Sequence, residues 1–283
     1  MAVFYNQATL TLNGSTINSN ITQGELTESL SVTKTAVVPE YGTGDRVTYI
    51  ISLVNSSDTQ LSGLSVSDDL GAYEFGTQQV VPLTYTENSL RYYQDGVLQG
   101  TPKVAVAAQL LVEGVTVPAN GSSMLVYEVT ANDFASPQVG GEVTNTVTVS
   151  GGVLASAITA AETITALQEP QLSIVKNLSP TTVTTGGELT YTFTVYNSSN
   201  TPVLAADNAV ITDTFDPVLH GITVTLDGAV LPASSYTYDE TTGEFATNAG
   251  VLSVDAAQFD QDSTTGQWST VPAAAVLTIT GTV

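Results

Sequence analysis

Two sets of side chains in this sequence could be joined by covalent bonds. Each set has a lysine, an aspartate and an asparagine: Lys34, Asp68 and Asn145 in the first, and Lys176, Asp213 and Asn6 in the second. A desolvated, neutral lysine is a nucleophile, and a protonated aspartic acid can polarise the carbonyl of an asparagine carboxamide. Attack of the amine on that carbonyl gives an amide and releases ammonia. We therefore expect each aspartate to be the catalytic residue of a Lys–Asn isopeptide cross-link within its own set.

The lysines fall on the apolar faces of predicted strands. Side chains along a strand alternate between its two faces, so Lys34 shares a face with Leu30 and Val32 in the stretch LSVTK. Lys176 ends the similar stretch LSIVK. Burying a lone ammonium costs several kcal/mol, so its charge has to be paired or removed. A buried ion pair with the aspartate of the same set is the alternative interpretation of each lysine.

An internal repeat relates the two sets. Residues 44–57, GDRVTYIISLVNSS, match residues 187–199, GELTYTFTVYNSS, and each lysine stands 15 residues before the tyrosine of this motif. Short runs of alternating apolar residues are bounded by turn residues, and KVAVAAQLLV is one run expected to form a strand. This spacing predicts an all-β fold of two tandem immunoglobulin-like β-sandwich domains with an N-terminal donor strand or hairpin.

The repeat is offset against the ends of the chain. The first copy closes with VTNTVTV, which contains Asn145, and the second copy stops at LTITGTV before any such stretch. The front of the chain, FYNQATL, aligns with the closing stretch and places Asn6 on Asn145. We therefore interpret the chain as three parts: residues 1–29 as a donor hairpin that completes a neighbouring subunit, residues 30–168 as the first β-sandwich domain, and residues 169–283 as a second β-sandwich domain that lacks its own last strand.

The composition of the chain argues against two classes of partner, nucleic acids and membranes. The formal net charge is −22, with 5 Lys and Arg against 27 Asp and Glu, and such a surface repels phosphates, so we expect no nucleic acid partner. No apolar run is long enough to span a bilayer, which indicates no membrane insertion. The beginning of the sequence has no standard signal peptide, and Cys is absent. We expect an extracellular location, or one on a cell or spore surface, reached without a standard signal peptide in this chain.

Motifs for turnover of an external substrate are absent from the sequence. The single histidine, His220, lies in DPVLHG, which indicates a loop. There is no G-x-S-x-G, no H-E-x-x-H and no glycine-rich phosphate loop after a strand. We predict no enzyme activity beyond single-turnover, autocatalytic formation of the cross-links, and no cofactor. Asp260, Asp262 and Thr264 alternate as calcium ligands do, but the closing glutamate is missing, so we interpret them as part of a hairpin turn and predict no metal site.

The same motifs carry a resemblance to a known family. The LSVTK-type first strand, the VTY strand that ends in Asn, the strand end VITD and the final VTNTVTV resemble the bacterial surface-repeat family called domain of unknown function eleven. The resemblance covers both copies and implies immunoglobulin-like stalk modules on bacterial surfaces. Related sandwich domains of pilins and adhesins carry Lys–Asn isopeptides with an acidic catalyst. Small proteins with two such copies resemble the fibre proteins of spore appendages.

The offset of the repeat also predicts how subunits join. Insertion of the N-terminal hairpin of one subunit beside the open edge of the second copy in another is donor-strand complementation, and this head-to-tail contact propagates a filament in which the protein is its own partner. One alternative is that the hairpin folds back onto its own chain. Others are that the chain is a fragment of a longer adhesin stalk, or a surface adhesin that binds glycan or protein through loops. The loop aromatics considered for the adhesin, whose other interpretation is cross-strand packing, are Tyr92, Tyr93, Tyr236, Tyr238 and Trp268.

Overall fold

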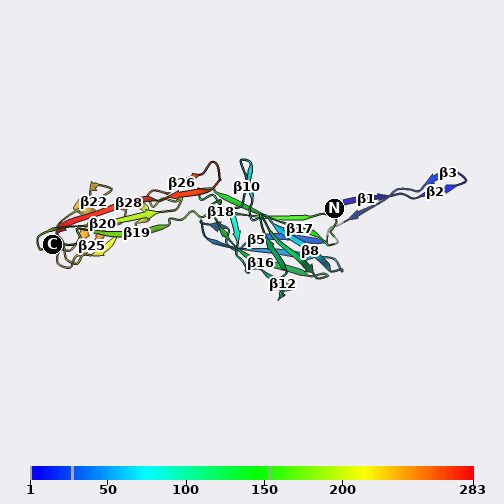
Figure 1. The fold of residues 1–283 in the computed structure, drawn as a ribbon, viewed down its shortest axis with the longest axis horizontal. Coiled ribbons are helices and arrows are strands. Elements are labelled where there is room, and N and C mark those ends of the chain that lie inside the picture. Colours follow the sequence, from blue (N-terminus) through cyan, green and yellow to red (C-terminus); the bar gives the residue numbers. More distant parts are fainter. Residues whose placement is uncertain (1, 27–28, 153) are drawn as a thin grey trace. The chain divides into compact units, whose positions relative to one another are not determined.

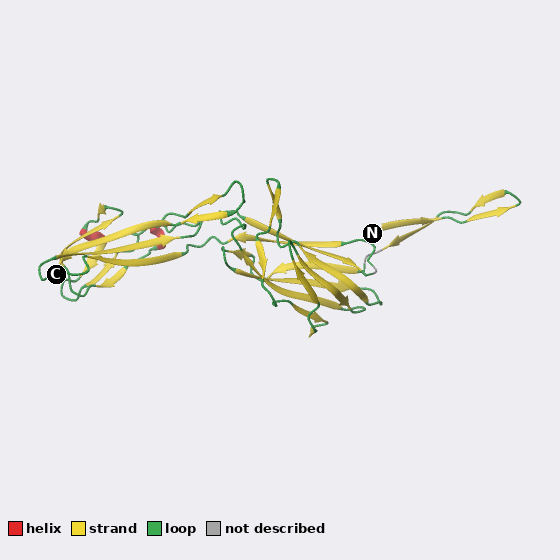
Figure 2. Ribbon diagram, viewed as in Figure 1, coloured by secondary structure: helices red, strands yellow, loops and turns green. Residues whose placement is uncertain are grey.

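The structure is a computed structural model that describes residues 2–26, 29–152 and 154–283. Almost every element of these residues is a β-strand, and the exceptions are two single 3₁₀ turns, Ala205–Asp207 and Ala233–Ser235. The predicted all-β fold class is therefore confirmed (Figure 2). Within the described residues, no helix has the length and apolar character needed to cross a bilayer.

Two compact units make up the chain, and we describe each by itself. Residues 1, 27 and 28 of the predicted donor hairpin lie outside the described part, as does residue 153. The first unit contains residues 1–39, 44–132 and 143–164, and the second contains residues 40–43, 133–142 and 165–283.

The first sandwich packs two sheets around one core. Its first sheet has the order β13 (Val97–Leu98), β12 (Arg91–Gln94), β16 (Ser122–Ala131), β7 (Arg46–Asn55) and β5 (Leu30–Ala36), and β11 (Leu83–Tyr85) also pairs with β16. The strands of its second sheet, in order, are β14 (Lys103–Val106), β15 (Leu110–Val117), β8 (Leu61–Asp68), β17 (Glu142–Gly151), β18 (Ile158–Ala166) and β6 (Glu40–Tyr41). A small hairpin, β9 (Tyr73–Phe75) with β10 (Gln78–Val80), follows β8.

One predicted strand is in fact two. KVAVAAQLLV forms β14 and β15, which run antiparallel with Val106 opposite Leu110. The turn between them is closed by the backbone N–H of Ala107, which donates to the carbonyl of Gln109 at 3.1 Å. The prediction of one strand was wrong because this stretch contains no Gly, Pro, Asn or Asp to indicate a turn.

Alternation along the central strand of the first sheet explains the core. On β7, every second side chain from Val47 to Leu53 is buried, as a strand with one face against a core requires. Lys34 on β5 stands opposite Ile51 of β7, so its side chain points into the same core. The predicted inward face of LSVTK is therefore the observed one.

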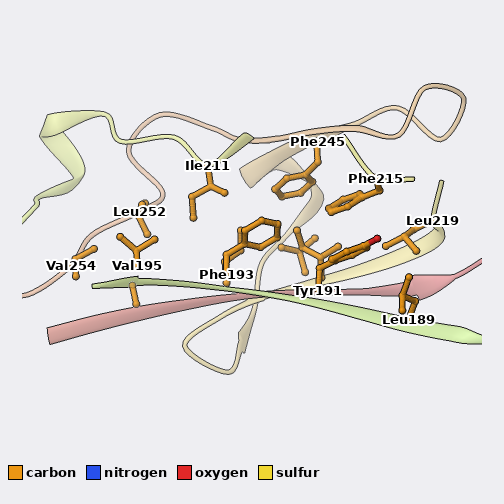
Figure 3. Close-up of a cluster of buried hydrophobic side chains, with 14 of the residues drawn as sticks. Leu189, Tyr191, Phe193, Val195, Ile211, Phe215, Leu219, Phe245, Leu252 and Val254 are labelled. Atoms are coloured by element: carbon orange, nitrogen blue, oxygen red, sulfur yellow. The ribbon is translucent and has the colours of Figure 1, made fainter. Parts of the chain in front are cut away.

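The second sandwich repeats this arrangement with fewer strands. Its larger sheet has the order β19 (Leu172–Ser179), β20 (Glu188–Asn197), β28 (Ala273–Thr282), β22 (His220–Leu226) and β23 (Ala229–Val230). Its smaller sheet has the order β21 (Thr212–Thr214), β25 (Glu244–Thr247) and β24 (Tyr236–Tyr238). Figure 3 shows Ile211, Phe215 and Phe245 facing Tyr191, Phe193 and Val195 across the buried cluster. A hairpin of β26 (Gln258–Gln261) and β27 (Trp268–Val271) lies outside these two sheets.

The two copies match in detail along β7 and β20, which lie beside the lysine-bearing strands β5 and β19. β20 has the same sequence of exposed and buried positions as β7. Each strand ends in a buried asparagine, Asn55 or Asn197, whose amide donates to the carbonyl four residues later at 2.8 Å and 2.7 Å respectively. Equivalent positions in the two copies can therefore be compared directly.

The smaller sheet of the second sandwich has a free edge. In the first sandwich, β8 lies between β15 and β17, and β17 carries Asn145. Its counterpart β21 pairs with β25 on one side, and among the described residues no strand pairs with it on the other. All eight side chains of β19, the strand that carries Lys176, are exposed. A free edge and an exposed apolar strand are features that proteins usually cover.

The N-terminal segment is a long hairpin (Figure 1). β1 (Ala2–Asn6) pairs with β4 (Thr22–Leu26), and β2 (Thr9–Leu12) pairs with β3 (Ser15–Asn18). Asn13 and Gly14 form the turn with φ of 49° and 81°, as a two-residue hairpin of this twist requires. All side chains of residues 3–23 are exposed. Because an isolated two-stranded hairpin is marginally stable in water, we expect another surface to cover these apolar side chains.

A glycine turn brings β17 close to the end of β8. Gly71 has φ of +73°, and a Cβ at this position would lie 2.5 Å from Cγ1 of Val143. Asp69 also joins the end of β8 to β17. Its carboxylate accepts the backbone N–H of Thr146 at 2.8 Å, and its own N–H donates to the carbonyl of Thr146 at 3.0 Å. Asn145 lies between these two contacts along β17.

We predict that Gly71→Ala destabilises the first sandwich by at least about 1 kcal/mol more than Gly63→Ala, because overpacking adds to the backbone strain. Gly63 is a matched control, since its φ is +68° but no atom lies within 4 Å of its ideal Cβ position. Thermal and guanidinium unfolding measure the difference. Equal destabilisation by the two substitutions would contradict the close approach of Val143.

Candidate functional site

The first site is built from strands of both sheets of the first sandwich. Lys34 projects from β5 on one sheet. Asp68 ends β8 on the facing sheet, in register with Val147 of β17, and Asn145 precedes Val147 by two residues and so shares its inward face. The structure therefore brings the three predicted residues Lys34, Asp68 and Asn145 into one buried place.

The carboxylate of Asp68 connects the site. Its Oδ2 accepts hydrogen bonds from the ammonium of Lys34 and from the hydroxyl of Tyr127 on β16. Its Oδ1 accepts the backbone N–H of Leu70 at 3.0 Å. The side chains of Lys34 and Asp68 are 0% and 1% exposed, so the charge pair is removed from water. A pair this deeply buried is costly unless it is fully hydrogen-bonded.

Burial also sets the protonation of the neighbouring groups. It lowers the pKa of Lys34 below the usual 10.5, although the Asp68 carboxylate acts in the opposite direction. Burial raises the pKa of Tyr49 and of Tyr127, and the Asp68 carboxylate raises both further. The amine is thus biased toward its neutral, nucleophilic form while both phenols stay protonated.

Asn145 is buried, and its side chain has no hydrogen-bond partner within the described residues. Neither the nitrogen nor the oxygen of its carboxamide has one there, and the buried hydroxyl of Tyr49 has none either. The amide lies beside the hydroxyls of Tyr49 and Tyr127, where it acts to lower the pKa of each, but no aligned hydrogen bond joins them. Buried carboxamides are nearly always hydrogen-bonded, so an unsatisfied one beside a lysine needs an explanation.

The second site has the same centre in a more open setting. Lys176 on β19 forms an ion pair with Asp213 on β21. Its ammonium lies 4.6 Å from the ring centroid of Tyr191, which stacks on Phe215 (Figure 3). The side chain of Lys176 is 41% exposed and that of Asp213 is 19% exposed. Desolvation at this site is therefore incomplete.

Two differences distinguish the second site from the first. Tyr127 stands opposite Tyr49 in the first sandwich, and Ile279 stands opposite Tyr191 in the second, so the hydroxyl that binds Asp68 has no counterpart there. In the first sandwich β17 lies beside β8 and supplies Asn145, whereas no strand in the described part of the chain pairs with the corresponding edge of β21. The remaining predicted residue, Asn6, is exposed on β1 opposite Thr22, and its bond to Lys176 stays a prediction.

The sequence analysis did not count Tyr49 or Tyr127 among the site residues. Tyr49 and its counterpart Tyr191 each follow a lysine by the same number of residues, and that regular spacing was the available signal. Tyr127 carried no such signal, because its counterpart in the repeat is Ile279.

Other candidate residues lie elsewhere than predicted. His220 does not lie in a loop but begins β22, with its imidazole 3.6 Å from the Glu240 carboxylate. The carboxylate of Asp262 accepts the backbone N–H groups of Thr264 and Thr265 in the turn between β26 and β27, the position interpreted as a hairpin turn. The prediction that the aromatics lie in loops is wrong, since strands carry all of them: Tyr92, Tyr93, Tyr236, Tyr238 and Trp268.

Comparison with known proteins gives likenesses only among solved structures. No family model matches the chain, and no curated protein matches it. The pilus backbone protein RrgB of Streptococcus pneumoniae is 14% identical at a TM-score of 0.35, over 87% of this chain and 55% of that chain. The major pilin subunit BcpA of Bacillus cereus is 11% identical at a TM-score of 0.38, over 96% and 73%. Domains D2 and D3 of the major pilin SpaD of Corynebacterium diphtheriae are 12% identical at 0.35, over 85% and 88%.

These similar structures are pilus proteins, and the resemblance to domain of unknown function eleven stays a prediction. With TM-scores of 0.35 to 0.38, the likenesses carry no argument about what this chain does. The function has to be argued from the residues of the two sites.

A variant that cannot form the bond should reveal the buried lysine in its pH dependence. Burial lowers the folded-state pKa of Lys34 below the usual 10.5, and we expect the same in Asn145→Ala, so that directly below that pH the unfolded chain binds more protons than the folded one. The free energy of unfolding then rises with pH, by up to about 1.4 kcal/mol per pH unit. Guanidinium unfolding at several pH values between pH 8 and pH 10 measures this slope. The control is Lys34→Met in the same background, and equal slopes would contradict the lowered pKa.

Proposed function

We propose that this protein is a structural subunit that assembles head to tail into an extracellular filament. The N-terminal hairpin of one subunit completes the second sandwich of the next, and Lys–Asn isopeptide bonds lock both the first sandwich and the junction. The observation that carries the proposal is the contrast between two copies of one site. The first has an asparagine buried beside the Lys–Asp pair, and in the corresponding place of the second the described residues leave a strand edge free.

The first bond follows from the arrangement around Asp68. A proton passes from the ammonium of Lys34 to the Asp68 carboxylate, which leaves a neutral amine beside a neutral acid. The amine nitrogen attacks Cγ of Asn145, the Cγ–Nδ2 bond breaks, and Nδ2 leaves as ammonia. The product is a neutral amide in a site that is closed to water, so the buried charges of Lys34 and Asp68 no longer have to be stabilised.

The exposed hairpin offers a strand that fits the free edge. Asn6 is in register with Asn145 in the repeat, and the apolar residues around it continue the alternation of a core-facing strand. β19 and the hairpin each expose apolar side chains. Among the largest are, on β19, Leu172, Ile174, Val175 and Leu178, and on the hairpin, Val3, Phe4, Tyr5, Leu10, Leu12, Ile17 and Ile21.

Insertion of the hairpin would also activate the second lysine. The side chain of Lys176 is 41% exposed, so water still solvates its ammonium. A strand that covers the free edge of β21 would remove that water, and desolvation favours the neutral, nucleophilic form of an amine. The incoming subunit would thus supply both the carboxamide of Asn6 and the condition for its reaction, with Asp213 as the acid.

A junction of this type propagates. The donor hairpin and the acceptor edge are different surfaces of the chain, so the contact is heterologous and generates an open filament unless the rotation closes into a ring. Backbone hydrogen bonds of an added strand give such contacts their affinity, and the alternating side chains give the register.

The intramolecular bond predicts a loss of mass. The monomer of the wild-type protein should be lighter than its sequence by one ammonia, and tandem mass spectrometry should place the cross-link between Lys34 and Asn145. Lys34→Met, Asn145→Ala and Asp68→Asn should each retain the full sequence mass, because each lacks the nucleophile, the electrophile or the acid. A wild-type monomer of full sequence mass would refute the first bond.

The intersubunit bond predicts a ladder of oligomers. Wild-type protein should give bands that survive boiling in detergent, and Asn6→Ala should abolish them while leaving the loss of one ammonia in the monomer unchanged. Asn20→Ala is the matched control, since this exposed asparagine of the same hairpin should leave the ladder intact.

Other outcomes of that experiment would overturn parts of the proposal. A monomer that loses a second ammonia and forms no ladder would show that the hairpin folds back onto its own chain. Filaments in the electron microscope that dissolve completely on boiling would leave strand donation standing and remove the covalent junction. Absence of both filaments and ladder would refute assembly by strand donation.

A further inference from the structure

The unexplained feature of the first site is a cluster of buried polar atoms without partners. Among the described residues, four buried side-chain atoms have no hydrogen-bond partner, and three of them belong to Tyr49 and Asn145. An unsatisfied buried polar group destabilises the fold, so a coincidence of three in one place is more than a packing defect. The proposed bond uses the carboxamide of Asn145, but it leaves the hydroxyl of Tyr49 unexplained.

The hydroxyl of Tyr49 is placed to meet the reacting carbonyl. Tyr49 and Ile51 share the inward face of β7, and Lys34 stands opposite Ile51, so the amine and the phenol are neighbours on one sheet. The ammonium of Lys34 lies 4.8 Å from the centroid of the Tyr49 ring. Asn145 comes from the facing sheet, and its carboxamide lies beside the Tyr49 hydroxyl.

The other donors of the site are already engaged. The hydroxyl of Tyr127 donates to Oδ2 of Asp68, and the N–H of Leu70 donates to Oδ1 of the same carboxylate. Tyr127 also stacks on Tyr49, with ring centroids 5.9 Å apart and planes at 24°, which holds the Tyr49 ring in place. Of the described hydroxyls beside the carboxamide, that of Tyr49 is therefore the one still free to donate.

The second copy separates the roles of the two tyrosines. Tyr191 occupies the position of Tyr49 and lies under the ammonium of Lys176 as Tyr49 lies under that of Lys34. Tyr127 is replaced by Ile279. A hydroxyl kept at both sites is the one that the shared reaction needs, whereas the Tyr127 hydroxyl orients Asp68 at the first site alone.

We infer, on the basis of the proposed function, that the Tyr49 hydroxyl is a catalytic residue that stabilises the oxyanion formed on Asn145 during bond formation, and that Tyr191 does the same for the junction. When the neutral Lys34 amine bonds to Cγ, the carbonyl electron pair moves to Oδ1, and the Tyr49 O–H donates a hydrogen bond to that oxygen. The pair returns as the Cγ–Nδ2 bond breaks. The Asp68 carboxylic acid gives its proton to Nδ2, which leaves as ammonia, and takes up the excess proton of the attacking nitrogen. Tyr49 neither gains nor loses a proton overall.

The test follows the rate of ammonia loss in the full chain. Protein is made by cell-free translation, synthesis is stopped, and intact mass is followed with time for wild type, Tyr49→Phe, Tyr127→Phe and Tyr92→Phe. Removal of one oxyanion donor should slow ammonia loss by about 100-fold in Tyr49→Phe. Tyr92→Phe is the matched control, because the Tyr92 hydroxyl is a donor to the carbonyl of Thr116 away from the site, and its rate should equal that of wild type.

A stability measurement separates catalysis from packing. In a Lys34→Met background, where the bond cannot form, Tyr49→Phe should leave the melting temperature unchanged or raise it, because it removes an unsatisfied hydroxyl. Tyr92→Phe should lower it, because a hydrogen bond is lost. Two outcomes would overturn the inference: Tyr49→Phe loses ammonia as fast as wild type, or it loses ammonia slowly but lowers the melting temperature in the Lys34→Met background as much as Tyr92→Phe does. In either case the mass loss of the wild-type protein would still support the proposed function.

The second copy provides an independent test. Tyr191→Phe should slow the growth of the boiling-resistant ladder and leave the ammonia loss of the monomer at the wild-type rate. A ladder that grows at the wild-type rate in Tyr191→Phe would overturn the shared role. A wild-type protein that loses no ammonia and forms no ladder would refute both the inference and the function on which it rests.

Discussion

Removal of the Lys34 ammonium from water is the constraint on which the rest of the first sandwich depends. The charge is held by Asp68, which is itself held by Tyr127 and by the backbone of Leu70. Such a network is costly when any member is missing, because the uncompensated charge stays buried. The glycine turn at Gly71 and the contacts of Asp69 bring β17 close enough to place a carboxamide beside the pair. The charge pair is therefore an unfavourable arrangement, and the neutral amide that we propose between Lys34 and Asn145 would relieve it.

The same physics links folding to assembly in the second sandwich. Its Lys–Asp pair is only partly desolvated, and the strand edge beside it is free within the described residues. Covering that edge with a strand would bury apolar side chains, satisfy backbone groups and desolvate the lysine in a single event. A covalent junction formed in this way would suit a chain without Cys, which has no disulfides with which to resist unfolding.

Comparison of the copies shows which side chains the two sites share. The lysine, the aspartate and the tyrosine under the ammonium occur in both. The tyrosine that binds Asp68 occurs in one, and Ile279 replaces it where Phe215 packs on Tyr191. A tyrosine ring under the ammonium is thus common to both sites. The hydrogen bond from a tyrosine hydroxyl to the carboxylate occurs only in the first, buried site among the described residues.

The sequence by itself determined the all-β class, the two copies, and the inward direction of Lys34 and Asp68, because strand alternation and the repeat spacing are local properties of the chain. It failed where an apolar run turned without a turn residue, between β14 and β15. Only the tertiary structure decided that Tyr127 reaches Asp68, that Tyr49 and Asn145 face each other without partners, and that Lys176 stays open to water. These facts depend on which sheet packs on which and on the strand that lies beside each edge, and neither is encoded in the spacing of residues along one strand.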